Sequence, residues 1–171
     1  TSHIYVSTNV TYFRISEYEL SLIRATNLTI QTIGSGSLIN VYSVLASDVA
    51  GITDSVILDS SSTGCSIAFI QTSTWRGLRG YGASGITIAA NISSTISQIY
   101  LDGNADSSGS DTIAFQSGSL WLNAAGGSSR QLILVASGSG TIVGIAPLYL
   151  YGTNGIQSTV PYSAKRRCCP A

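Results

Sequence analysis

The sequence predicts an all-β protein, with a β-sandwich or jelly-roll-like fold favoured and a β-solenoid as the alternative. Short alternating or apolar runs recur along the chain, clusters of Gly and Ser separate them, and no apolar stripe with helical spacing extends beyond about two turns. A solenoid should repeat with a fixed period, but the intervals between apolar runs vary from about 8 to about 19 residues. The sandwich is therefore the leading expectation.

Composition limits the class of protein. The 171 residues fit one domain with a core of its own. Charged residues make up 9% of the chain and hydrophobic residues 44%, so the chain should fold although its surface carries little charge. Eight basic and eight acidic residues cancel, which disfavours nucleic acid as a partner. Apolar runs are far shorter than the ~18 residues of a spanning helix, so we expect no membrane span.

Strands are expected in order along the whole chain. Turn clusters rich in Gly and Ser, such as 34–37, 60–64, 103–110 and 137–140, separate them. The expected strands cover residues 4–15, 18–24, 27–33, 38–45, 55–58, 66–71, 75–81, 86–92, 96–101, 112–115, 120–123, 131–136, 141–145 and 148–151.

The first of these strands is long, and it lies at the extreme end of the chain. With a period of two, Ile4, Val6, Val10 and Tyr12 share one face. A terminal strand frays unless it is docked in a sheet, and an unpaired apolar face invites pairing with another chain. The segment is therefore either the edge strand of its own sandwich or a donor strand that completes the sheet of the next subunit.

On residues 3–15, and on its size and low charge, the chain resembles the pilin-like subunits of extracellular fibres built by donor-strand exchange. The resemblance implies a structural, non-enzymatic subunit that polymerises head to tail, with a further copy of itself as partner. The chain departs from chaperone–usher pilins because it lacks an early Cys pair.

Three segments are expected: a donor strand (1–16), a sandwich body (17–164) and a basic, Cys-containing tail (165–171). No Met is present, and removal of a secretory leader is the commonest origin of such a chain, so we expect an extracellular or cell-surface location. Cys65, Cys168 and Cys169 are an odd number of thiols. Either Cys65 forms a disulfide with the tail, or all three are reduced.

Asn9, Asn27 and Asn91 each begin an Asn-x-Ser/Thr sequon. Flanking apolar residues alternate onto the opposite face of each expected strand, which turns the asparagines outward. Glycosylation at these three positions is therefore an expectation, and glycans are possible partners.

No arrangement of residues predicts catalysis. Nucleophilic triads need His, and His3 is the single one in the chain. Glu17 and Glu19 would share a strand face as an acid pair, but exposed charges that discourage strand mispairing are the favoured explanation. We therefore expect a protein that is not an enzyme.

Two surface sites are candidates. Oxygen-bearing side chains in the loop at Asp102, Asn104, Asp106 and Asp111 could converge on calcium, or they could form an ordinary polar turn without a cofactor.

Trp75, Arg79 and Tyr81 would share one strand face, as in a sugar- or partner-binding platform. The favoured function is a fibre subunit, and the alternatives are a viral jelly-roll capsid or fibre protein and a carbohydrate-binding adhesin module.

Overall fold

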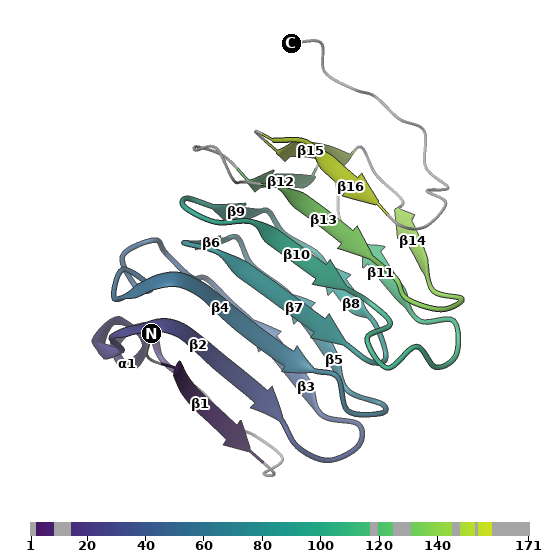
Figure 1. Ribbon diagram of the computed structural model, residues 1–171, viewed down its shortest axis with the longest axis horizontal. Coiled ribbons are helices and arrows are strands. Elements are labelled where there is room, and N and C mark those ends of the chain that lie inside the picture. The colour runs from purple at the N-terminus through teal and green to yellow at the C-terminus, as the bar shows by residue number, and fades with distance from the viewer. Residues whose placement is uncertain are drawn as a thin grey trace.

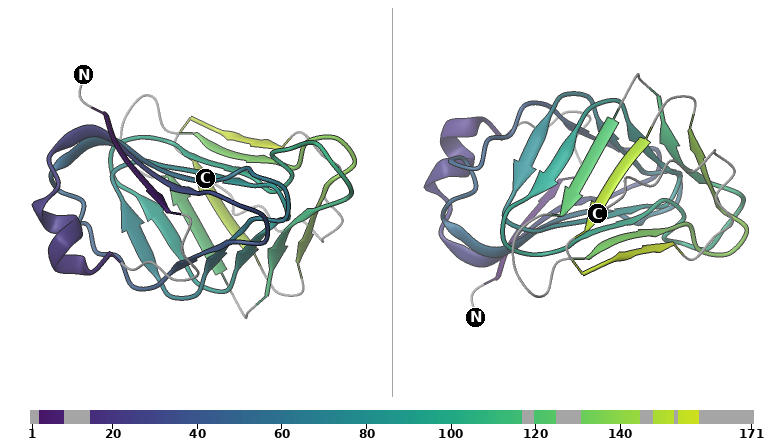
Figure 2. Two further views of the ribbon diagram at one scale, coloured as in Figure 1. Left: turned by 90° about the horizontal axis from the view of Figure 1, so that it is seen from below. Right: turned by 90° about the horizontal axis from the view of Figure 1, so that it is seen from above.

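The chain winds into a parallel β-solenoid with three sheets (Figure 1). The computed structural model describes residues 3–8, 15–116, 120–124, 131–144, 148–152 and 154–158. Every strand pairing within these residues is parallel. From residue 52 onward the chain visits sheets A, B and C in turn and returns to sheet A one level higher in the stack, so that three sheets enclose one interior (Figure 2).

Sheet A is the largest sheet and runs the length of the stack. Its seven strands, in spatial order, are β1 (His3–Thr8), β2 (Ala25–Thr32), β4 (Ile52–Ser60), β7 (Leu78–Gly82), β10 (Ile99–Asp102), β13 (Leu132–Val135) and β16 (Ile156–Ser158).

Sheets B and C complete each turn of the solenoid. Sheet B contains β3 (Leu38–Val41), β5 (Ser66–Phe69), β8 (Ile86–Ile88), β11 (Thr112–Phe115) and β14 (Thr141–Gly144). Sheet C contains β6 (Ser73–Trp75), β9 (Ile92–Ser94), β12 (Leu120–Ala124) and β15 (Leu148–Gly152).

The predicted β-sandwich or jelly roll is therefore wrong. Those folds pair antiparallel strands through hairpins, whereas parallel neighbours need a crossover, and here the crossovers from residue 52 onward pass through the other two sheets. Alternation of buried and exposed residues looks the same in both architectures, because each strand has one face on the core. The architecture found is the solenoid that the sequence analysis placed second.

The predicted strand at 18–24 is also wrong, because residues Glu17–Leu22 form a helix, α1. Ser16 caps it: the Glu19 backbone N–H donates to Ser16 Oγ at 3.3 Å, and the Ser16 backbone N–H donates to Glu19 Oε2 at 2.9 Å. This reciprocal capping box fixes the helix start. Glu17 and Glu19 are thus neither an acid pair nor charges on a strand edge, since residues two apart on a helix do not face each other.

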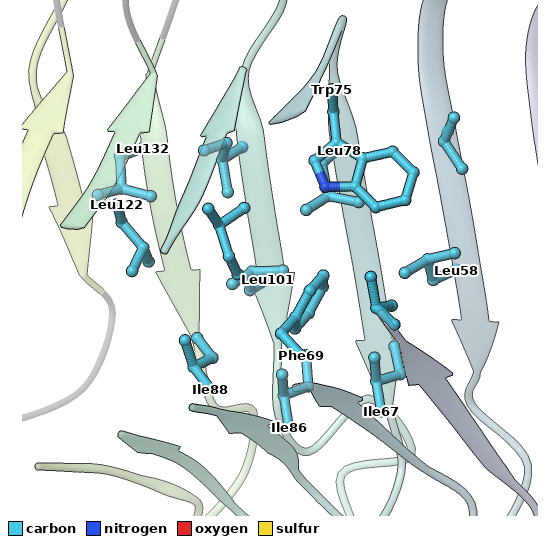
Figure 3. Packing of buried hydrophobic residues seen from close by; sticks show 14 of the residues in the cluster. Leu58, Ile67, Phe69, Trp75, Leu78, Ile86, Ile88, Leu101, Leu122 and Leu132 are labelled. Carbon is cyan, nitrogen blue, oxygen red and sulfur yellow. The ribbon is translucent and has the colours of Figure 1, made fainter. Parts of the chain in front are cut away.

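Isoleucines in register form the interior of sheet B. Each member lies beside the next on the adjacent strand, and the series is Ile39, Ile67, Ile86, Ile113 and Ile142. Leucines of sheet A face them, and the rings of Phe69 from sheet B and Trp75 from sheet C fill the space between (Figure 3). Stacking like side chains on like keeps the interior continuous from turn to turn, which is how a solenoid buries its apolar faces.

Gly80 lies in the interior at a position where a larger side chain would clash with its neighbours. A Cβ at this position would lie 2.9 Å from Leu101 Cδ2 and 3.6 Å from the Cδ1 atoms of Ile67 and Ile86. Glycine leaves this space to the larger neighbours, as close packing in a core demands.

Candidate functional site

The structure separates Trp75 from Arg79 and Tyr81. Trp75 ends β6 in sheet C and is 2% exposed, and its Nε1 donates to Ser73 Oγ at 2.9 Å. The chain then turns a corner and enters β7 of sheet A, where Arg79 and Tyr81 alternate with buried residues. The predicted common face of all three side chains is wrong, because the corner falls inside what reads as a single strand.

Arg79 and Tyr81 instead lie in the middle of the outer face of sheet A, next to residues from other turns. Tyr100 of β10 pairs with Arg79, and Asp102 pairs with Tyr81. On the other side Asp59 of β4 pairs with Tyr81. We call Asp59, Arg79, Tyr81 and Tyr100 the sheet A patch. Sequence reasoning missed Tyr100 and Asp59 because they belong to neighbouring turns of the solenoid and not to the same strand.

Two phenol rings form the centre of the sheet A patch. The centroids of Tyr81 and Tyr100 are 5.5 Å apart and the rings are tilted by 42°, a geometry that aromatic pairs favour. Burial raises the pKa of Tyr100, and Asp102 and Tyr81 raise it further, while Arg79 lowers it. The Tyr100 hydroxyl therefore remains protonated at neutral pH and can donate a hydrogen bond.

The charged groups of the patch are positioned by different neighbours. Asp59 accepts a hydrogen bond from Gln31 Nε2 at 2.8 Å and another from the Ser61 backbone N–H at 3.1 Å. Arg79 Nε is buried and has no hydrogen-bond partner within the described residues. One donor of the guanidinium is thus unsatisfied, and an unsatisfied buried polar atom destabilises the fold.

Asp102, one of the proposed calcium ligands, belongs to a buried network that joins two turns of the solenoid. Its Oδ2 accepts from Ser137 Oγ at 2.9 Å and its Oδ1 from the Asn104 backbone N–H at 3.1 Å. Asn104 in turn donates through Nδ2 to the Ser137 carbonyl at 2.6 Å. Asp102 is 6% exposed and Asn104 is fully buried, so both side chains hold the loop 103–111 against the next turn.

Asp106 and Asp111, the other two proposed ligands, have other surroundings. Asp106 accepts hydrogen bonds from the backbone N–H and the hydroxyl of Ser108, which lower the pKa of this carboxyl. The Asp111 carbonyl accepts from the Thr141 N–H at 3.3 Å. Within the part of the chain that the structure describes, no three His, Cys, Asp or Glu side chains are grouped as a metal site. Calcium binding remains a prediction from the sequence.

Asn27 and Asn91, two of the three sequon asparagines, join successive turns. Asn27 Oδ1 accepts from the Ser55 backbone N–H at 3.2 Å, and Asn91 Oδ1 accepts from the Trp121 backbone N–H at 2.9 Å. Both side chains are partly buried. Asn9 lies outside the described residues, and glycosylation stays a prediction at all three.

Cys65 is a buried, free thiol whose Sγ donates to the Gly34 carbonyl at 2.8 Å. The proposed partners Cys168 and Cys169, with the rest of the tail 165–171, lie outside the described residues.

The N-terminal segment pairs with its own chain. β1 lies parallel to β2, with His3 opposite Asn27 and Thr8 opposite Thr32. Ile4 and Val6 belong to β1, whereas Val10 and Tyr12 lie outside the described residues.

No family model, curated protein or solved structure matches this chain. No helix in the described part of the chain is long and apolar enough to cross a membrane.

Proposed function

We propose that this chain is a non-enzymatic binding module of an extracellular surface, which holds a saccharide against the outer face of sheet A. The observation that carries the proposal is the sheet A patch, in which three adjacent strands bring together a carboxylate, a guanidinium and two phenols.

The chemistry of the patch suits a ligand rich in hydroxyl groups. Each sugar hydroxyl both donates and accepts, and Asp59 offers acceptors while Arg79 and Tyr100 offer donors. The tilted rings of Tyr81 and Tyr100 offer aromatic faces, whose negative potential attracts the C–H groups of a sugar ring. A patch that contains both a guanidinium and a carboxylate fits an uncharged polyol better than an ion of either sign.

The patch is built for binding without reorganisation. Its side chains stand on strands fixed by continuous backbone pairing, about 4.8 Å apart. Rigid placement lowers the entropy lost when a ligand binds. Chemistry is a weaker interpretation, because Asp102, the second carboxylate next to Tyr81, is buried and bonded to Ser137.

Glycan-array screening followed by calorimetry tests this function. Tyr100→Phe removes one hydroxyl, and Arg79→Lys keeps the charge but loses the planar guanidinium and its paired N–H donors. Each variant should weaken binding about tenfold, since a hydrogen bond to a charged or buried group contributes roughly 1.5 kcal/mol. Arg24→Lys is the matched control, because Arg24 bonds to the Ser21 carbonyl near α1. Unchanged affinity in both patch variants, or no retained glycan, would refute the proposal.

Self-association through β1 is a second candidate function, favoured by the position of this strand. β1 is the edge strand of sheet A, and residues 9–24 connect it to its partner β2. The same parallel hydrogen bonds would form if β1 of one copy paired with β2 of another, which gives a head-to-tail polymer. Insertion into a sandwich groove, as in pilins, does not apply to a solenoid.

Light scattering of the full chain and of a chain lacking residues 1–8 tests this candidate. Exchange predicts concentration-dependent oligomers in the full chain that disappear on deletion. Val6→Pro is the milder variant, because proline within a strand disfavours pairing without shortening the chain. A full chain that stays monomeric at the highest soluble concentration would eliminate β1 exchange.

A further inference from the structure

The outer face of sheet C carries a second cluster of aromatic side chains. Trp121 of β12 pairs with Tyr149 of β15, and their rings are stacked with centroids 4.5 Å apart and an interplanar angle of 13°. Tyr151 follows two residues after Tyr149, so it lies on the same face of β15. We call Trp121, Tyr149 and Tyr151 the sheet C platform.

Two of these rings are about half exposed to solvent. Trp121 is 51% exposed and Tyr151 is 54% exposed. Isolated exposed aromatics are common, but a contiguous group on a flat sheet marks a binding surface. The platform measures about 5 Å between strands and about 7 Å along a strand, which is the scale of one sugar ring.

Among the described residues, polar and uncharged side chains lie in register with the platform. Asn123 pairs with Tyr151, and Ser93 pairs with Asn123 on the preceding turn. Asn123 Oδ1 is buried without a hydrogen-bond partner in the described part of the chain. One amide acceptor beside the rings therefore still lacks a donor among the described residues, and none of the strand residues that pair with the platform is charged.

The platform is also held in place by the preceding turn. The backbone N–H of Trp121 donates to Asn91 Oδ1 at 2.9 Å, and the hydroxyls of Thr74 and Ser93 lie 3.0 Å apart. The first contact ties β12 to the chain just before β9, and the second ties β9 to β6. The stack against Tyr149 leaves the Trp121 ring less side-chain freedom to lose when a ligand binds.

We infer that the sheet C platform is a second binding site, which holds an uncharged saccharide by stacking a pyranose ring on Trp121 and Tyr151. Exposed aromatic faces attract the C–H face of a sugar, and the neighbouring amide and hydroxyl groups match its hydroxyls. The site lies on a different sheet from the sheet A patch, so neither site depends on the other.

The two tryptophans of the chain make this inference directly testable. Trp75 is 2% exposed and bonded to Ser73, whereas Trp121 is 51% exposed, so their indole N–H signals report on the core and on the platform respectively. Cellohexaose, chitohexaose and mannohexaose are titrated into 15N-labelled protein. We expect at least one of them to shift the Trp121 signal in a saturable manner and to leave Trp75 unmoved. Trp121→Phe assigns the signals.

Variants complete the test. Trp121→Ala and Tyr151→Ala should each weaken binding about tenfold or more, since one stacked ring contributes on the order of 1–2 kcal/mol. Tyr42 is 55% exposed and lies elsewhere, so Tyr42→Ala is the control and should bind as the wild type does. Tyr100→Phe should leave the Trp121 shift intact, which separates this site from the sheet A patch. A Trp121 signal unmoved by all three sugars at about 10 mM overturns the inference. So does a Trp121 signal that changes with protein concentration alone, because a second copy then covers the platform.

Discussion

Tyr100 shows how a single side chain reports on the turns around it. It lies in β10, but the groups that raise its pKa include Tyr81 of the preceding turn. Burial contributes most, because a phenolate in the partly buried patch would lose hydration that the unfolded chain supplies. The folded protein therefore holds the proton of Tyr100 more tightly than the unfolded chain does.

A pH dependence of stability follows from this difference. Tyr100 has its ordinary pKa of 10.0 in the unfolded chain and a higher one in the fold. Its contribution to stability is fully present below the unfolded pKa and is lost as the pH rises through the folded pKa. Urea unfolding between about pH 8 and about pH 11 should therefore show a smaller loss of free energy in Tyr100→Phe than in the wild type. Equal losses in the two proteins would contradict the assigned shift.

Other residue roles could not be read from the sequence, because their partners lie one turn away. Asn27 and Asn91 look like outward sequon asparagines, yet their side-chain oxygens bond to the backbone of Ser55 and of Trp121. The local pattern fixes the direction of a side chain but not the identity of its neighbour on the next strand. Alternation could indicate that Arg79 and Tyr81 share a face, and it could not reveal Tyr100 beside them.

At the scale of elements, one local sequence motif correctly indicates an element that the structure contains. Ser16 and Glu19 have the spacing of a capping box, which is a readable signal for the start of α1. The alternation of apolar residues after it led instead to a strand prediction. Only Leu20 of α1 is buried, so this six-residue helix has too short an apolar stripe to be recognised by its period.

The corners between the strands of one turn cannot be recognised from the sequence. β6 and β9 contain three residues each, and β6 is separated from β7 only by Arg76 and Gly77. Two short strands and such a corner keep an approximate period of two, so they read as one longer strand. The prediction of one strand over 75–81 therefore joined an inward Trp75 to outward residues of another sheet.

At the scale of the whole molecule, the turns of the solenoid repeat regularly in space, but the number of residues from one turn to the next varies. The isoleucines of sheet B are stacked in register, but 19 residues separate Ile67 from Ile86 and 29 separate Ile113 from Ile142. Loops of different length cause this variation while the strands stay aligned. A fixed period is thus a sufficient sign of a solenoid and not a necessary one, which is why the sandwich was favoured from the sequence.

Because each turn contacts mainly its neighbours, removing one whole turn should leave a shorter solenoid. Leu78 and Ile99 occupy equivalent positions, so deletion of residues 78–98 returns the chain to sheet A in phase. The deletion sets Asp59 beside Asp102, and opposed like charges destabilise a sheet, so it is combined with Asp59→Asn. We expect a folded protein that is less stable by about 1–3 kcal/mol.

Deletion of residues 78–91, with Asp59→Asn, is the matched control for phase. It joins β6 directly to β9, and two parallel neighbours in sheet C cannot be connected by so short a link. Circular dichroism and cooperative thermal unfolding should show a folded β protein for the first deletion and none for the second. The in-phase variant should also lose binding at the sheet A patch, because Arg79 and Tyr81 lie in the deleted turn. Equal disruption by both deletions would mean that the turns do not fold as interchangeable units.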